Sequence, residues 1–165
     1  QNKPFNEIDE EWWDYMMDLS LKGYFFACQK ASKEMVKRGT KGSLICISSV
    51  HSFRAAENWT PYGIAKIGVR RMVKGLAADL ANTGINSNCI APGAINNTIP
   101  EDDKVEPEAM DMPWVPSGRQ GLPSDISNAV IFLSSKMGEY VNGETILVDG
   151  GLIATGLGDG RPDGK

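Results

Sequence analysis

Apolar residues recur at helical spacing in three segments of the chain. The first, residues 10–38, follows Asp9 as a candidate N-cap and stops at Gly39. The second, residues 60–81, opens with a threonine as N-cap and a proline at the first helical position. The third covers residues 124–135. We therefore expect one long helix near the start of the chain and two further helices.

Short, mostly apolar runs alternate with these helices. They are SLICIS at residues 43–48, INSNCIA at residues 85–91 and ETILVD at residues 144–149. The alternation predicts an α/β fold whose parallel strands are joined by right-handed crossovers, with helices on both faces of the sheet. Ligands bind at the carboxyl ends of the strands in such sheets, and Ser49 and the pair Pro92–Gly93 fall there.

Length and charge narrow the class of protein. A chain of 165 residues with 41% hydrophobic side chains suits one domain, which we expect to span residues 1–151, with residues 152–165 as an irregular tail. A net charge of −4 disfavours nucleic acid and anionic membrane as partners. No apolar run approaches the roughly 18 residues needed to cross a bilayer, and no signal peptide is recognisable at the start. We expect a cytoplasmic protein.

The cysteines and the single histidine argue against a disulfide framework and a metal site. Cys28, Cys46 and Cys89 are odd in number, scattered and set among apolar residues, which suits buried free thiols in a reducing compartment. His51 is the only histidine, so the clustered ligands of a zinc site are missing. We expect no metal.

Three residues form a pattern that suits proton exchange. Tyr62 and Lys66 lie one helical turn apart and share a face, so the ammonium group favours the phenolate form of the tyrosine. Ser49, at the end of the preceding strand, is placed to hydrogen-bond the same substrate oxygen. The tyrosine–lysine spacing alone is weak, because roughly one chain of this composition in four has it by chance. Together, the three suit the interconversion of a carbonyl and an alcohol with a hydride carrier.

Five stretches, in this order and spacing, resemble the short-chain dehydrogenase/reductase family: ISSV, YGIAK, GINSNCIAPGAI, GRQGLPSDISNAVIFLSS and YVNGETILVDGG. The resemblance extends from Phe5 to Gly151. It implies that Ser49 orients the substrate oxygen, that Tyr62 is the general acid/base, and that Lys66 favours its phenolate and binds the nicotinamide ribose. The implied cofactor is NAD or NADP.

The same resemblance assigns cofactor contacts to the loop after the second strand. It implies that Pro92 and Gly93 flank the nicotinamide and that the backbone of Ile95 contacts its carboxamide. The family's threonine falls on Asn97, with Thr98 next, so either residue is a candidate contact to cofactor phosphate or amide.

One candidate catalytic position departs from the family pattern. Ser20 stands in SLKG, where the resemblance implies an asparagine of the proton relay. A serine can hydrogen-bond a carbonyl and hold a water, but its reach is shorter. Two interpretations stay open for Ser20, a modified relay and a neutral helix substitution.

A larger departure concerns the nucleotide-binding half. The family's glycine-rich phosphate turn and first strands have no counterpart here, and GLGDG at residues 156–160 does not replace them, because no helix opens after it. We therefore interpret the chain as the C-terminal part of a doubly wound, Rossmann-like parallel sheet. An N-terminal nucleotide-binding segment or chain would complete it. Without that partner the strand at residues 43–48 has an open edge, and we expect the chain to aggregate.

The remaining candidates concern substrate and assembly. We expect His51, Trp59 and Ala94 to line the substrate pocket, although His51 also suits a merely exposed loop residue. Residues 96–116 are polar, acidic and broken by prolines, and are either a substrate lid or a plain surface loop. The resemblance implies that the long first helix and the helix carrying Tyr62 pack between subunits, giving a homo-oligomer or hetero-oligomer.

These observations lead to one principal hypothesis and one rival. The principal hypothesis is an NAD(P)-dependent oxidoreductase that interconverts a ketone and a secondary alcohol, active only with its N-terminal half. Its partners are that half and a small-molecule substrate. The rival is a non-catalytic chain that assembles or regulates a dehydrogenase-like complex.

Overall fold

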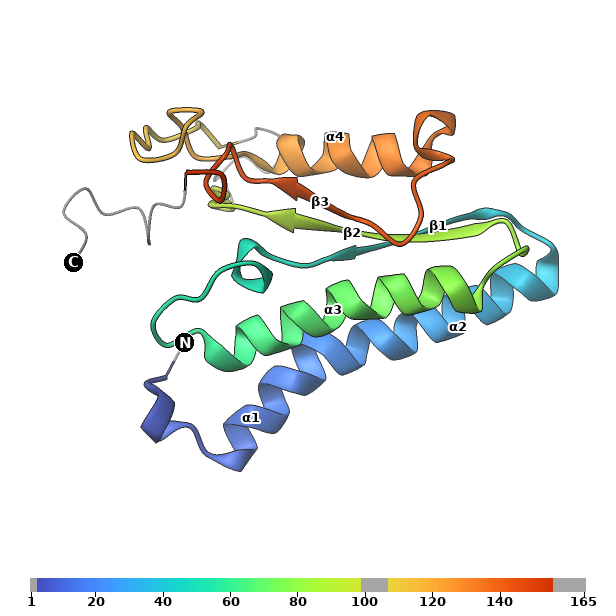
Figure 1. Cartoon of the computed structure of the whole chain (residues 1–165), viewed down its shortest axis with the longest axis horizontal. Coiled ribbons are helices and arrows are strands. Elements are labelled where there is room, and N and C mark those ends of the chain that lie inside the picture. The colour runs from blue at the N-terminus through green and yellow to red at the C-terminus, as the bar shows by residue number, and fades with distance from the viewer. Residues whose placement is uncertain (1–2, 99–106, 156–165) are drawn as a thin grey trace.

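A three-stranded parallel sheet forms the centre of the computed structural model, which describes residues 3–98 and 107–155 (Figure 1). Its strands are β1 (Gly42–Ile47), β2 (Ile85–Pro92) and β3 (Thr145–Val148), in the order β1-β2-β3. All three predicted strands are confirmed to within one residue at each end. The predicted α/β class with a parallel, Rossmann-like sheet is also confirmed.

Helices cover both faces of this sheet. The N-terminal helix has three parts, namely α1 (Glu10–Met17), a π-helical turn (Asp18–Lys22) and α2 (Gly23–Arg38). It lies with α3 (Thr60–Asp79) on one face, and α4 (Pro123–Ser134) lies on the other (Figure 1). Short 3₁₀ turns add to these at Phe5–Glu7, Val50–Ser52 and Lys136–Gly138. None of the helices in the described part of the chain combines the length and the apolar character needed to span a bilayer.

The π-helical turn was not predicted. It closes with a hydrogen bond from the Gly23 backbone N–H to the Asp18 carbonyl, five residues back. A side chain at position 23 would bring its Cβ to 3.3 Å from that carbonyl oxygen, so glycine suits this wider turn. The apolar spacing spans the whole helix and therefore did not reveal one locally inserted residue. The turn shifts the face that the N-terminal part of the helix presents to the rest of the molecule.

Most observed helix ends and caps agree with those predicted from the sequence. The Asp9 carboxylate accepts a hydrogen bond from the Trp12 backbone N–H at 2.7 Å, and Gly39 adopts the left-handed conformation with φ of 64°. The assignment of Thr60 as N-cap is wrong by one residue. Trp59 holds that position without a side-chain cap, and its carbonyl accepts the first helical hydrogen bond.

The two crossover connections have opposite hands. The chain moves from β1 through α3 to β2 and then, in the same direction across the sheet, through α4 to β3. Because α3 and α4 cover opposite faces (Figure 1), only one of the two connections can be right-handed. The prediction that all crossovers are right-handed is therefore wrong for one of them. A long connection precedes α4, which gives the chain the length to reach the other face.

Within the described residues β1 is an edge strand. Ser48 donates its backbone N–H toward β2, to the Ile90 carbonyl at 2.7 Å. Neighbouring residues of a strand point their backbone groups to opposite sides, so Ile47 faces the outer edge. There its carbonyl accepts a hydrogen bond from Lys66 Nζ at 3.0 Å rather than from another strand.

The core lies between the sheet and the layer formed by α2 and α3. All three cysteines are buried and free, as predicted. They are joined in one cluster by the buried residues Leu44, Val69, Val73 and Ile85.

At the start of the predicted tail, Leu152 is buried against Val50 and Val115. The boundary predicted at residue 151 stays a prediction. The segment GLGDG at residues 156–160 and residues 99–106 of the predicted lid lie outside the described part of the chain.

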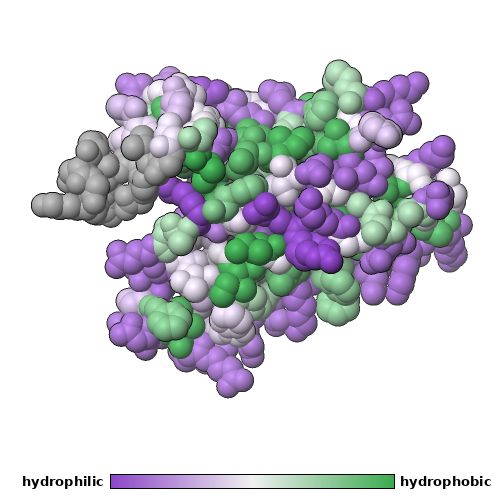
Figure 2. Space-filling model, in the orientation of Figure 1, coloured by the Kyte–Doolittle hydropathy of each residue, from purple (hydrophilic) through white to green (hydrophobic). Residues whose placement is uncertain are grey.

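Hydrophobic side chains also reach the surface. Figure 2 shows them gathered over α4 and β3 and again over the N-terminal half of α3, with a polar band between. On α3 they include Ile64 and Ile67, which are 43% and 53% exposed. These areas offer apolar surface that the described residues leave uncovered.

Candidate active site

Ser49 sits where β1 ends and a single 3₁₀ turn begins. Its hydroxyl oxygen accepts the backbone N–H of His51 at 3.2 Å, and its carbonyl accepts the hydroxyl of Ser52 at 2.6 Å. The preceding Ser48 ties this turn to α3, because its hydroxyl donates to the Lys66 carbonyl at 2.9 Å. Serine at three positions thus fixes the strand end against the helix that carries the tyrosine and lysine.

Lys66 holds a buried ammonium group at the same place. The residue is only 7% exposed, and its Nζ lies 5.4 Å from the centre of the Tyr62 ring. Burial lowers the pKa of Lys66, and the neighbouring Cys46 offsets part of that effect. The structure brings the Lys66 ammonium and the Tyr62 ring together, as the spacing predicted.

Tyr24 is a third aromatic component that the sequence did not reveal. The centre of its ring lies 5.0 Å from Lys66 Nζ. Burial raises the pKa of Tyr24, so this ring stays neutral. The only sequence signal for this contact is that Tyr24 comes four residues after Ser20. Lys66 donates to the carbonyl of Ile47 and contacts two aromatic rings.

Ser20 lies inside the π-helical turn and is 6% exposed. Its hydroxyl donates to the sulfur of Met16 at 3.4 Å. In this conformation the hydroxyl is engaged within its own helix. The contribution of Ser20 to a proton relay stays a prediction.

His51, Trp59 and Tyr62 form an aromatic wall. The rings of His51 and Trp59 stack at 4.2 Å between centres and 4° between planes. Tyr62 meets them edge to face, at 5.9 Å from His51 and 5.2 Å from Trp59. Burial, followed by the charge of Arg54, lowers the pKa of His51, so its neutral form prevails at neutral pH. The structure thus places His51 and Trp59, both predicted substrate contacts, against Tyr62, the predicted general acid/base.

The strand end at Pro92 and Gly93 approaches the end of β3 closely. A Cβ on Gly93 would lie 2.7 Å from Asp149 Cα, and the Gly93 backbone N–H donates to the Val148 carbonyl at 2.9 Å. Only glycine allows this approach, so the sequence pair has a structural reason. Its predicted contact with a nicotinamide stays a prediction.

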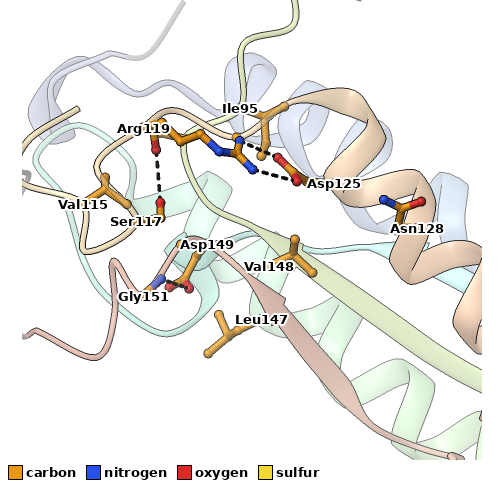
Figure 3. A pocket seen from close by; sticks show the side chains of 13 residues that line it. Ile95, Val115, Ser117, Arg119, Asp125, Asn128, Leu147, Val148, Asp149 and Gly151 are labelled. Carbon is orange, nitrogen blue, oxygen red and sulfur yellow. Dashed lines mark hydrogen bonds and ion pairs between the residues drawn. The ribbon is translucent and has the colours of Figure 1, made fainter. Parts of the chain in front are cut away.

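Ala94 and Ile95 line a cavity of about 440 Å³ between the ends of β2 and β3 and the start of α4 (Figure 3). Beside Ile95, the Arg119 guanidinium forms two hydrogen bonds with the Asp125 carboxylate, at 2.8 and 3.0 Å (Figure 3). None of the Ser49, Tyr62 and Lys66 side chains lines this cavity. The structure therefore does not join Ala94 to the catalytic group through this cavity, and its substrate contact stays a prediction.

Asn97 and Thr98 follow on the same loop with exposed side chains. The preceding Asn96 is buried and holds the loop, because its side chain accepts the Thr98 backbone N–H at 3.1 Å and donates to the Glu108 carbonyl at 3.0 Å. Both predicted cofactor contacts are thus sterically open, and their assignment is still a prediction.

Comparison with known proteins identifies the family. The family model described as Enoyl-(Acyl carrier protein) reductase matches residues 1–153. The chain is 40% identical to 2-dehydro-3-deoxy-D-gluconate 5-dehydrogenase of Escherichia coli over 90% of this chain and 59% of that protein. It is also 40% identical to L-rhamnose-1-dehydrogenase of Scheffersomyces stipitis over 92% of this chain and 59% of that protein. The chain belongs to the short-chain dehydrogenase/reductase family, as the motifs predicted.

Solved structures agree with this assignment. A gluconate 5-dehydrogenase from Burkholderia cenocepacia, in complex with NADP and tartrate, aligns with a TM-score of 0.79 and 33% identity. The alignment covers 93% of this chain and 61% of that structure. The chain therefore spans about three fifths of the length of the relatives it matches.

Proposed function

We propose that this chain forms the catalytic part of an NAD(P)-dependent oxidoreductase that interconverts a secondary alcohol and a ketone. The observation that carries the proposal is the buried Lys66 ammonium beside the Tyr62 ring, at the strand end that presents Ser49. The family membership supports it, since the relatives named above are dehydrogenases. The intact group of three also argues against the rival, a chain that only assembles or regulates a complex.

In alcohol oxidation Tyr62 takes the hydroxyl proton as its phenolate, while Ser49 donates a hydrogen bond to the same substrate oxygen. Lys66 would stabilise the phenolate with a positive charge that the Ile47 carbonyl and two aromatic rings hold in place. In ketone reduction the tyrosine returns the proton. A nicotinamide held by these residues would supply the hydride chemistry at the substrate carbon.

The chain's own groups fit such a cofactor. An ammonium group has three N–H donors, and the described residues give Lys66 one protein acceptor, the Ile47 carbonyl. The other two donors suit the hydroxyls of a nicotinamide ribose. Pro92 and Gly93 would flank the ring, the backbone of Ile95 would contact its carboxamide, and Asn97 or Thr98 would contact the phosphate or amide. The NADP complex of the Burkholderia cenocepacia relative supports this class of cofactor.

We propose that an N-terminal segment or chain pairs with the outer edge of β1 and brings the nucleotide-binding loop. Two observations support this. The backbone of Ile47 faces the outer edge of β1, and the relatives extend beyond the part that this chain matches. Turnover would require that partner. We further place the enzyme in the cytoplasm, on the strength of its three free thiols.

For the substrate we propose a sugar, a sugar acid or a related polyhydroxy compound. His51 and Trp59, which both contact the Tyr62 ring, line a cavity of about 280 Å³ that offers space beside the proposed catalytic group. The Trp59 ring beside it offers an apolar face for the carbon skeleton of a sugar. Relatives that act on gluconates and rhamnose support this class.

We also propose that a second subunit packs on the outer face of the N-terminal helix and α3. An apolar groove of about 330 Å³ runs there, and its lining includes Leu21, Phe25, Phe26 and Met72. Phe25 and Phe26 are 45% and 55% exposed, which is unusual for a monomer's surface.

The test is turnover of the full-length protein with NAD or NADP on a panel of sugar acids and polyols. Tyr62→Phe removes the exchangeable proton and keeps the ring, and we expect activity to fall to background. Tyr140→Phe is the matched control, because that tyrosine is fully exposed and should keep wild-type activity. Absence of turnover in the wild-type protein on every substrate would favour the non-catalytic rival.

A further inference from the structure

Two buried thiols that the proposed mechanism does not use touch each other behind the active site. Cys28 lies on α2 and Cys46 on β1, and their sulfur atoms are 3.5 Å apart. The two residues are 7% and 1% exposed. The third thiol, Cys89, points instead to the hydroxyl of Thr145 at 3.1 Å. The chain therefore holds one pair of thiols in contact and one thiol outside the pair.

The pair is placed against the groups that hold Lys66. Cys28 comes one helical turn after Tyr24, whose ring lies against the ammonium. Cys46 immediately precedes Ile47, whose carbonyl accepts the hydrogen bond from the ammonium. A covalent link between the two sulfurs would therefore join α2 and β1, the two elements whose residues Tyr24 and Ile47 contact the Lys66 ammonium.

The two thiols differ in acidity in a way that suits disulfide formation. The hydrogen bond from Cys46 lowers the pKa of Cys28, whereas that contact and burial raise the pKa of Cys46. The thiolate is the nucleophilic form of cysteine, so Cys28 is the attacking sulfur and Cys46 the resolving one.

We propose that Cys28 and Cys46 form an oxidation site that a hydroperoxide closes to a disulfide, and that closure slows turnover by displacing the groups around Lys66. The Cys28 thiolate attacks the peroxide, the O–O bond breaks, and a sulfenic acid and an alkoxide or hydroxide result. The Cys46 thiol then attacks that sulfur, the S–S bond forms and water leaves. Overall, the two thiols lose two electrons and two protons. An organic hydroperoxide is reduced to an alcohol and one water, and hydrogen peroxide is reduced to two waters.

The size of the movement supports an effect on catalysis. The sulfurs must approach from 3.5 Å to the bonding distance of about 2 Å, and rotation of the two buried side chains and movement of α2 and β1 share these roughly 1.5 Å. Misplacement of a catalytic group by about 1 Å can cost about 100-fold in rate. We therefore expect oxidation to lower turnover about tenfold or more, and a thiol reductant to restore it.

The first test is a peptide map of the full-length protein after treatment with hydrogen peroxide and alkylation of the remaining thiols. We expect a linked peptide pair containing Cys28 and Cys46, lighter than the two reduced peptides by two hydrogen atoms. Cys28→Ser and Cys46→Ser should each abolish the link, and Cys89→Ser, the matched control, should retain it. Alkylation of both thiols after oxidation, or a link to Cys89, would overturn the proposal.

The effect on turnover rests on the proposed function and is measured separately. Peroxide should reduce the rate of the wild-type and Cys89→Ser enzymes and leave the Cys28→Ser enzyme unchanged. A disulfide that forms without any change in rate would overturn the coupling to Lys66. If the wild-type protein has no activity at all, the proposed function fails while the peptide map still decides the oxidation site.

Discussion

Replacing Lys66 by methionine removes the buried ammonium and keeps a side chain of similar length. The Nζ atom lies 5.4 Å from the centre of the Tyr62 ring. The ammonium has three N–H donors and the described residues give it one acceptor, so two donors are left for the proposed nicotinamide ribose. A hydrogen bond from a charged group contributes about 1.5 kcal/mol or more, so the loss of two removes about 3 kcal/mol. This corresponds to about 100-fold in kcat/KM.

The assay is kcat/KM for alcohol oxidation by the full-length enzyme at one fixed, neutral pH. For Lys66→Met we expect kcat/KM to fall about 100-fold. Lys74→Met is the matched control on the same helix, since that exposed side chain makes only a 3.6 Å ion pair with Glu144. An unchanged kcat/KM in Lys66→Met would refute the role given to the ammonium.

Three further predictions follow from contacts around the site. Tyr24→Leu should lower kcat several-fold, because it removes the cation–π contact with Lys66. Tyr24→Phe keeps the ring and should retain most of the activity. Equal losses of kcat in the two variants would contradict this prediction. Gly93→Ala should lower the free energy of unfolding in urea by about 1–3 kcal/mol, because its Cβ would meet the end of β3. Gly75→Ala, in the interior of α3 where a Cβ meets nothing closer than 3.5 Å, should raise that free energy. A Gly75→Ala variant less stable than Gly93→Ala would contradict the prediction. Because the pKa of His51 is lowered in the folded state, the unfolded state binds the proton first, and stability should fall as the pH drops below about 6.5. His51→Phe should weaken this pH dependence in urea titrations between pH 5 and 8, and an identical dependence in both proteins would contradict the prediction.

The sequence predicted the fold where local signals and packing agree. The strands and helices were found because apolar spacing, the Asp9 cap and the stop at Gly39 all point to the same boundaries. The hand of the two crossovers could not be predicted. It depends on which face α4 covers, and this is decided by packing beyond the connecting loop.

The candidate site was predictable where the chemistry depends on spacing within one helix. Tyr62 and Lys66 follow from a single turn of α3, whereas Tyr24 reaches Lys66 from another helix, across a distance no local pattern encodes. The stack of His51 on Trp59 likewise depends on the path of an irregular loop. Ser20 was identified as a candidate from its position in the sequence. Its hydroxyl bond to the Met16 sulfur could not be predicted, because Ser20 lies in the π-helical turn that the sequence did not indicate.

The most direct test of the central claim is a crystal structure of the full-length protein with bound NAD or NADP. We predict that a further strand pairs with β1 on the side of Ile47 and that Tyr62 and Lys66 contact the nicotinamide ribose. The Lys66 ammonium should then keep its bond to the Ile47 carbonyl and donate its other two N–H groups to the ribose hydroxyls. A nicotinamide bound away from Tyr62, or a β1 edge covered by something other than a strand, would contradict the account.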